Sequence, residues 1–212
     1  MGADVIIPDK REIIVVLGRS GYGKSSWTKQ YVQGLSRLCV WDPKKSYLVD
    51  YPYDLSAYWE DEGPHEQFRI GGYYPEQAEI LGSIAFEAQR CALILEECGI
   101  LFQPRTDLPE WARECIYIGR EREVSVIAIA QRPRSINVVL RSQATRIVTF
   151  QQREPKDLEW LDECFDPDDI LSLDRLECLD FDVNTSEVSR YRVSLPSGNT
   201  SHKSDVTSQN NS

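Results

Sequence analysis

The eight residues Gly18 to Ser25, with the sequence GRSGYGKS, restrict the fold of this chain more than any other feature. They match the pattern G-x-x-x-x-G-K-[ST], in which glycines allow backbone N–H groups to wrap around phosphate groups. The pattern needs a strand before it and a helix after it. The chain supplies both, since the apolar run IIVVL precedes it and a helical pattern starts at Lys24. The segment therefore predicts a strand, a phosphate-binding loop and a helix in succession.

This loop also predicts the ligand. Lys24 is placed to reach the β and γ oxygens of a nucleoside triphosphate, and the Ser25 hydroxyl is placed to bind Mg²⁺ at the positive end of the helix. We therefore expect ATP and Mg²⁺ here. The predicted nucleotide-binding residues are Gly18, Arg19, Ser20, Gly21, Tyr22, Gly23, Lys24, Ser25 and Ser26.

The rest of the chain repeats the alternation of strand and helix. Short apolar runs rich in β-branched residues are typical of strands buried on both faces, and they lie at 13–17, 39–41, 91–95, 124–130 and 146–150. Helical patterns lie between them, at Lys24 to Leu38, Pro75 to Arg90 and Leu108 to Arg120. The prediction is a three-layer α/β/α fold with a central, mainly parallel sheet. A helix from Glu154 to Cys164 and an antiparallel strand pair, Leu176 to Asp182 and Glu187 to Val193, should follow.

We expect one domain over residues 1–195, because 212 residues suffice for one well-buried sheet. Residues 46–67, rich in Tyr and Trp, are predicted to be an insertion, and residues 154–195 the C-terminal helix and strand pair. Residues 196–212 are polar without apolar periodicity and are predicted to be a disordered tail. No apolar run is long enough for a transmembrane helix, no signal peptide is recognisable, and six cysteines form no C-x-x-C pair. These features predict a cytoplasmic protein without a zinc site.

Charge is distributed unevenly along the chain. The net charge of −10 argues against a general nucleic-acid coat, whose surface is normally basic. Residues 103–153 nevertheless carry nine Arg against five acids, a balance of +4, whereas residues 154–182 carry twelve acids against two basic residues, a balance of −10. Either segment could be a solvated face, or it could steer a charged partner. Any contact with nucleic acid must therefore be local.

Three polar residues follow predicted strands and are candidates for catalysis. Glu96 and Glu97 come directly after the run CALIL, and Gln131 comes directly after VSVIAIA. Ligands of parallel sheets bind at the carboxyl ends of the strands, so Glu96 could hold Mg²⁺ and Glu97 could polarise an attacking water. Gln131 could hydrogen-bond the γ-phosphate. The alternatives are that the two acids cap a loop and that the glutamine is an ordinary loop residue.

Taken together, GRSGYGKS, CVWDPK, LILEE, GREREVSVIAIAQRP and SQATRIVTF resemble motifs of the FtsK–HerA superfamily of hexameric DNA-pumping ATPases over residues 12–152. Within that superfamily, the short chain and the R-E-P at 153–155 with a following Leu-Glu-Trp are similar to the genome-packaging ATPases of membrane-containing icosahedral viruses. The resemblance implies a RecA/FtsK-like fold. It also implies that Glu96 orders the metal, Glu97 is the general base and Gln131 senses the γ-phosphate.

The resemblance further implies that Arg146, in the TRI segment, is supplied to the nucleotide of a neighbouring subunit. Such an arginine finger accelerates hydrolysis by about 10³- to 10⁵-fold. Arg120 and Arg122 are rival candidates for this role, and an ordinary ion pair is the alternative for any one of them.

The predicted function is that of a DNA-translocating ATPase, which packages double-stranded viral DNA into a preformed capsid by ATP hydrolysis. The active assembly is expected to be a ring, and the ring is expected to be a hexamer. The residues expected to touch DNA phosphates are Lys44, Lys45, Arg132, Arg134 and Arg141. Capsid or membrane-vertex proteins are possible further partners, which would place the chain in the host cytoplasm and at a virion vertex. The alternatives are a cellular HerA/FtsK-like translocase, a P-loop kinase acting on a small molecule, and a regulatory nucleotide switch.

Overall fold

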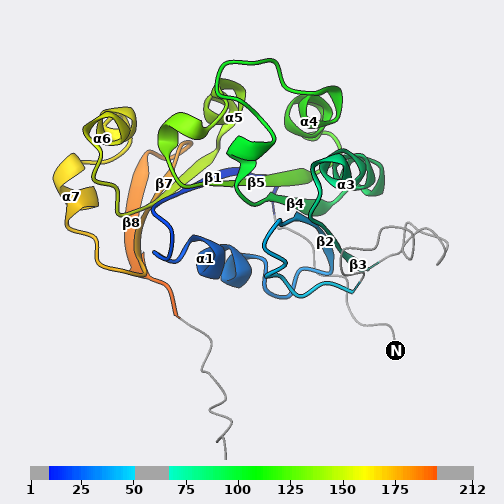
Figure 1. Ribbon diagram of the computed structural model, residues 1–212, viewed down its shortest axis with the longest axis horizontal. Coiled ribbons are helices and arrows are strands. Elements are labelled where there is room, and N and C mark those ends of the chain that lie inside the picture. The colour runs from blue at the N-terminus through cyan, green and yellow to red at the C-terminus, as the bar shows by residue number, and fades with distance from the viewer. Residues whose placement is uncertain (1–9, 51–66, 195–212) are drawn as a thin grey trace, which may run out of the picture.

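The computed structural model describes residues 10–50 and 67–194, and these contain one eight-stranded sheet (Figure 1). The strands lie in the order β3-β2-β4-β5-β1-β6-β7-β8. Their bounds are β1 Ile13–Leu17, β2 Arg37–Trp41, β3 Phe68–Gly72, β4 Cys91–Leu95, β5 Val124–Ala130, β6 Arg146–Phe150, β7 Glu177–Asp182 and β8 Glu187–Arg192. The first six are parallel to one another, and β7 and β8 are antiparallel to their neighbours. The predicted α/β fold with a mainly parallel sheet is thus confirmed.

Alternate residues of β1 face two separate cores. Ile13, Val15 and Leu17 belong to the core under α3 (Pro75–Ala88), and Ile14 and Val16 belong to the core under α1 (Lys24–Tyr31). Each face of the sheet is therefore covered by helices, and Figure 1 shows α1 on one side and α3, α4 and α5 on the other. A strand buried on both faces has no polar side, which explains why these strands read as continuous apolar runs.

The helices are shorter than the sequence pattern predicts. The helix that starts at Lys24 ends at Tyr31, because Gly34 turns with a φ of +88° and β2 begins at Arg37. The pattern from Leu108 to Arg120 gives only α4 (Glu110–Arg113), which continues as a single π-helical turn, η2 (Glu114–Ile118). The remaining helices are α5 Val138–Gln143, α6 Pro155–Leu161 and α7 Pro167–Leu171, with short 3₁₀ turns η1 Cys98–Ile100 and η3 Pro133–Ser135.

The predicted C-terminal strand pair is present, and it extends the main sheet. β7 pairs with β6 from Arg146↔Asp182 to Phe150↔Cys178, and β8 forms the outer edge. In β8, five of the six residues are exposed and only Tyr191 is half-buried. This edge therefore faces solvent along almost its whole length.

Two predicted segments lie largely outside the described residues. The structure does not describe residues 51–66 of the aromatic insertion or residues 196–212 of the predicted tail, so both predictions stay untested. Of the insertion, Tyr47 is described and is buried. Among the described residues, no helix is both long and apolar enough to cross a membrane.

Candidate functional site

The loop between β1 and α1 has the backbone that its glycines predict. Gly18 has a φ of +149°, and a Cβ there would lie 2.6 Å from the Cβ of Phe150. Gly23 has a φ of +118°, and a Cβ there would lie 3.0 Å from both Phe150 and Leu176. Residues other than glycine rarely adopt such angles, and here their side chains would also collide with the end of β6. The loop is therefore held by close packing against the neighbouring strand.

Lys24 is folded back onto this loop. Its Nζ donates hydrogen bonds to the carbonyl oxygens of Gly18, at 2.6 Å, and Arg19, at 3.2 Å, and its side chain is buried. Burial lowers the pKa of Lys24, and the nearby carboxylates of Glu97 and Glu96 oppose that shift. The ammonium group therefore already lies inside the loop, next to both acids.

The loop opens into a cleft of about 220 Å³. Its lining residues are Ser20, Gly21, Gly23, Lys24, Ser25, Ser26, Lys44, Arg175 and Leu176. The last two come from the segment before β7, where Arg175 Nε donates to the Gly21 carbonyl at 3.1 Å and Leu176 N donates to the Tyr22 carbonyl at 3.1 Å. No sequence pattern predicts these two residues, because their contacts join positions more than 150 residues apart.

Glu96 is a buried carboxylate at the end of β4. It accepts a hydrogen bond from the Tyr47 hydroxyl, at 2.9 Å, and lies near the Ser25 hydroxyl. Burial raises the pKa of Glu96, and the Ser25 and Tyr47 hydroxyls act in the opposite direction. The structure therefore brings together the two residues that the sequence assigns to Mg²⁺.

These residues fit a magnesium ion. Mg²⁺ prefers oxygen ligands and is usually held by one or two protein oxygens together with substrate phosphates and water. Ser25 and Glu96 offer a hydroxyl and a carboxylate close to one another, at the N-terminus of α1. Among the described residues no group of three or more His, Cys, Asp and Glu side chains could hold a metal alone. The Tyr47 hydroxyl, which sequence reasoning does not assign, fixes the carboxylate from the other side.

Glu97 lies next to Glu96 but faces different groups. Its backbone adopts the left-handed conformation with a φ of +52°. Its Oε1 accepts hydrogen bonds from Lys44 Nζ, at 2.7 Å, and from Gln131 Nε2, at 3.1 Å. Although burial alone raises the pKa of Glu97, the hydrogen bonds from Lys44 and Gln131 outweigh burial and the pKa lies below its ordinary value. Glu97 is therefore ionised at neutral pH and in contact with the amide predicted to sense phosphate.

The strand order explains why these residues meet. β5 lies between β1, which leads into the loop, and β4, which ends before Glu96. Gln131 follows β5 and so lies between the phosphate-binding loop and Glu97, and its backbone carbonyl accepts a hydrogen bond from Gln152 Nε2 at 3.1 Å. Three neighbouring strands thus supply the predicted residues from one edge of the sheet.

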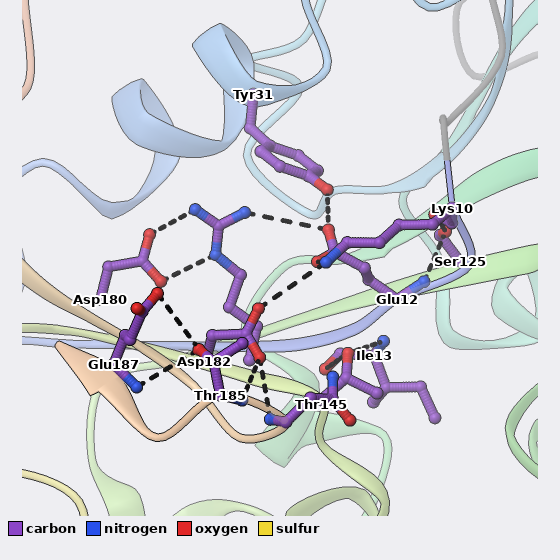
Figure 2. A network of polar contacts seen from close by, with 12 residues as sticks. Lys10, Glu12, Ile13, Tyr31, Ser125, Thr145, Asp180, Asp182, Thr185 and Glu187 are labelled. Atoms are coloured by element: carbon purple, nitrogen blue, oxygen red, sulfur yellow. Dashed lines mark hydrogen bonds and ion pairs between the residues drawn. The ribbon is translucent and has the colours of Figure 1, made fainter. Parts of the chain in front are cut away.

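Arg146 is not brought to this edge. It is the first residue of β6 and pairs in register with Ile14, at the amino end of the strands, whereas the loop follows the carboxyl end. Its guanidinium binds both carboxylate oxygens of Asp180 and forms an ion pair with Glu12 at 3.8 Å. Figure 2 shows Glu12, Tyr31 and Asp180 in this network. Arg146 thus has partners within its own chain. Its predicted role, as an arginine finger that acts on the nucleotide of a neighbouring subunit, stays a prediction that this placement does not favour.

The other arginines predicted to contact DNA or a neighbouring nucleotide differ in whether they have partners. Arg132 forms ion pairs with Asp157, at 2.9 Å, and Glu154, at 3.5 Å, and Arg141 forms one with Glu163 at 2.7 Å. Arg134 and Arg120 are exposed and have no ion pair among the described residues. Arg122 lies 4.0 Å from a Glu87 carboxylate oxygen, and its guanidinium stacks over the Phe86 ring at 4.7 Å from the ring centroid. Of the residues predicted to touch DNA, Arg134 is therefore the most available arginine.

The fold and the loop together define a P-loop nucleoside triphosphatase fold with a C-terminal antiparallel strand pair. No protein-family model and no curated protein sequence matches the chain. Among solved structures it is similar to the genome packaging NTPase B204 of Sulfolobus turreted icosahedral virus 2 in complex with AMPPCP, with a TM-score of 0.72 and 20% identity over 86% of this chain and 97% of that one.

Two further structures share the fold. The N-terminal domain of zonular occludens toxin from Neisseria meningitidis has a TM-score of 0.54 and 12% identity, over 87% of this chain and 95% of that one. The pCW3 conjugation coupling protein TcpA, solved with ATPγS, has a TM-score of 0.60 and 12% identity, over 86% of this chain and 60% of that one. The resemblance predicted from the sequence, to FtsK–HerA ATPases and in particular to viral packaging ATPases, is thus confirmed at the level of the fold.

Proposed function

We propose that this chain hydrolyses ATP in order to move double-stranded DNA, and that its task is to package a viral genome into a preformed capsid. The observation that carries the proposal is the contact of Glu97 with both Lys44 and Gln131, beside the loop that holds Lys24. An ionised carboxylate and a side-chain amide at this position are suited to activating water. The genome packaging NTPase of similar fold supports the biological part of the proposal.

In the proposed mechanism the loop first binds the triphosphate. Backbone N–H groups of residues 19–24 surround the phosphates, and Lys24 exchanges its bonds with the carbonyls of Gly18 and Arg19 for bonds with the β and γ oxygens. Ser25 and Glu96 would hold Mg²⁺, which supplies neutralisation of the phosphate charge when bound. The Ser26 backbone at the start of α1 adds the positive end of the helix.

Hydrolysis then uses Glu97 and Gln131. A water molecule attacks the γ-phosphorus, its proton passes to the Glu97 carboxylate, and the bond between the γ-phosphorus and the β–γ bridging oxygen breaks to leave ADP. Gln131, which already donates to Glu97, would orient the water or the γ-phosphate with its amide. Lys44 keeps Glu97 ionised before the proton arrives, because its hydrogen bond favours the charged carboxylate.

Movement of DNA is proposed to occur in a ring of copies, expected to be a hexamer, around the duplex. The net charge of −10 suits an acidic outer surface, so the DNA contacts must be confined to loops that carry exposed arginine, such as Arg134. We propose that residues 1–195 form the ATPase domain. Capsid or membrane-vertex proteins are the proposed docking partners, in the host cytoplasm and at the virion vertex.

Two other functions would use the same loop. A cellular HerA/FtsK-like translocase would have the same chemistry with a different DNA substrate. A P-loop small-molecule kinase would need a pocket for an acceptor in place of water, whereas the paired carboxylate and amide of Glu97 and Gln131 are suited to activating water. DNA dependence of hydrolysis separates a translocase from a kinase.

The test is ATPase turnover of the purified full chain with and without long duplex DNA. Wild type, Glu97→Gln and a matched control, Glu79→Gln on the exposed face of α3, should be compared. We expect DNA to stimulate the wild type and the control, and Glu97→Gln to be inactive under both conditions. Turnover that is indifferent to DNA and to Glu97→Gln would refute the proposal.

A further inference from the structure

Two loops leave the carboxyl edge of the sheet directly from the candidate catalytic residues. The first loop, residues 98–107, follows Glu97 and begins with η1. The second loop, residues 132–137, follows Gln131, contains η3 and ends at α5. Gln131 Nε2 donates to Glu97 Oε1 at 3.1 Å, so the loops are joined at their origins.

Asn137 joins the same loops at their far ends. Its side chain is only 1% exposed, and its Nδ2 donates to the carbonyl oxygens of Gln103, at 2.7 Å, and Thr106, at 2.9 Å. Its Oδ1 accepts from the Val139 amide at 3.0 Å and so caps α5. The amide therefore serves two functions through different atoms: the oxygen caps a helix of its own segment, and the nitrogen holds the other loop.

Two backbone contacts support this junction. The Val138 amide donates to the Pro104 carbonyl at 3.0 Å. Gly99 lies so close to the second loop that a Cβ there would be 3.3 Å from both the Cβ and the carbonyl oxygen of Ser135. The loops are thus in contact near their beginnings and their ends, which is the geometry of one packed unit.

The solvent side of this unit carries unpaired cations. Arg105 on the first loop and Arg134 on the second are exposed, and within residues 10–50 and 67–194 neither has a hydrogen-bond or ion-pair partner. Arg132 and Arg141, by contrast, are held by acids of α6 and the segment after it. An exposed guanidinium without a partner is suited to a phosphate contact, which is independent of base sequence.

We propose that Asn137 is a positioning residue that couples duplex DNA to hydrolysis: it makes the two loops one body, so that phosphate contacts of Arg105 and Arg134 act on Glu97 and Gln131 together. This inference rests on the proposed function. Coupling of this kind requires a physical element that both sites bias, and here the element is the joined pair of loops. Without the Nδ2 bonds, the far ends of the loops would be joined by the Val138–Pro104 backbone hydrogen bond alone, which loosens the first loop relative to the second.

The test uses Asn137→Ser, because serine caps helices about as well as asparagine but offers no second donor to Gln103 and Thr106. The matched control is Asp166→Ser, which makes the same kind of change at the cap of α7, outside both loops. The quantity measured is the ratio of DNA-stimulated to basal ATPase turnover. We expect Asn137→Ser to lower this ratio by at least about five-fold, the low end of typical coupling factors, and the control to keep it.

A second pair of variants covers the case in which Asn137→Ser fails to fold. Arg105→Ala combined with Arg134→Ala removes only exposed groups and should lower the same ratio, whereas Arg113→Ala, an exposed arginine of α4, should not. Suppose that DNA stimulates the wild type. If it then stimulates Asn137→Ser or the double arginine variant equally, this inference alone is overturned. A wild type that DNA does not stimulate would overturn both this inference and the proposed function.

Hydrogen exchange adds a readout that does not depend on turnover. Duplex DNA should protect backbone amides of residues 98–107 in the wild type, and less so in Asn137→Ser, because the loops then move separately. Equal protection in both proteins would contradict the coupling role.

Discussion

The two edges of the same sheet both carry basic groups bound to carboxylates, but they are built differently. At the carboxyl edge, Glu97 accepts single hydrogen bonds from Lys44, whose side chain is 56% exposed, and from Gln131. At the amino edge, Arg146 holds both oxygens of Asp180 and contacts Glu12, and these two acids are 5% exposed. A bound ligand can displace the exposed Lys44 from Glu97, whereas the carboxylates that Arg146 binds are buried and out of reach of a ligand.

The amino-edge network joins elements that are far apart in sequence. Tyr31 of α1 donates to Glu12, which precedes β1, and Tyr191 of β8 donates to Asp180 of β7 at 2.7 Å. The hydrogen bonds from Arg146 to Asp180 outweigh burial and raise the pKa of the guanidinium. The comparison teaches that the same kinds of residue lie at opposite ends of the strands in different settings, and we propose that they serve reaction at one end and cohesion at the other. Four substitutions test it.

Glu97→Gln should have the largest effect. Loss of a general base typically costs about 10²- to 10⁴-fold, so we expect kcat to fall about 10³-fold. Thermal stability should change little, because a glutamine side chain has nearly the size of the glutamate that it replaces. ATP hydrolysis kinetics and a melting curve measure the two quantities. A variant that loses activity only because it unfolds would show that Glu97 stabilises the fold, as Arg146 is expected to do, and would contradict the difference between the two edges.

Arg146→Ala should show the opposite pattern. It would leave the buried carboxylates of Glu12 and Asp180 without their common partner, which costs about 3 kcal/mol for a buried pair broken on one side. For a chain of this size the melting temperature should fall by roughly 6 to 12 °C. Turnover per folded molecule should be kept. If instead turnover is lost while stability is unchanged, Arg146 acts on a neighbour's nucleotide and the amino edge belongs to the reaction.

Lys44→Met should change the pH dependence of hydrolysis. The hydrogen bond from Lys44 lowers the pKa of Glu97, so its removal should raise that pKa. Glu97 must be ionised to accept a proton, and activity is lost as the pH falls through its pKa. The acid limb of kcat should therefore move to higher pH in Lys44→Met. An acid limb that does not move would show that Lys44 has no electrostatic influence on the base.

Tyr47→Phe should have the smallest effect. It removes a hydrogen bond to the buried carboxylate of Glu96, at a cost of about 1.5 kcal/mol at neutral pH. Burial already raises the pKa of Glu96, so its charged form destabilises the fold at high pH. The loss should therefore shrink as the pH falls and Glu96 becomes protonated. Denaturant melts of both proteins at several pH values measure this, and a loss that is independent of pH would contradict the assignment.

Local patterns make much of the fold and site predictable. The phosphate-binding loop, the positions of Glu96, Glu97 and Gln131 after their strands and the C-terminal strand pair all follow from short segments of sequence. β3 is not among the predicted strands, because FRIGG has two glycines and an arginine and does not read as a strand. The predicted end of the first helix lies beyond Tyr31 because apolar periodicity continues past that residue into β2.

Contacts between distant segments are not predictable in this way. The partner of Arg146 lies 34 positions away, and the resemblance that assigns this arginine a role for a neighbour carries no information about Asp180. Asn137 carries no signal either, since its partners lie 31 and 34 positions earlier and the sequence shows only an asparagine before an apolar run. Periodicity reports which face of an element is buried, but it does not report which polar side chains meet.

The exposed outer strand β8 has a consequence for assembly. Its sequence EVSRYR places charged side chains along an edge that no other strand within residues 10–50 and 67–194 pairs with, and Arg190 and Arg192 form ion pairs with Glu177 of the adjacent strand. Charged residues on an edge discourage a second sheet from pairing there. In the proposed ring, copies of this chain would therefore meet through side-chain surfaces and not by continuing one β-sheet from subunit to subunit, which would leave each subunit free to tilt against the next.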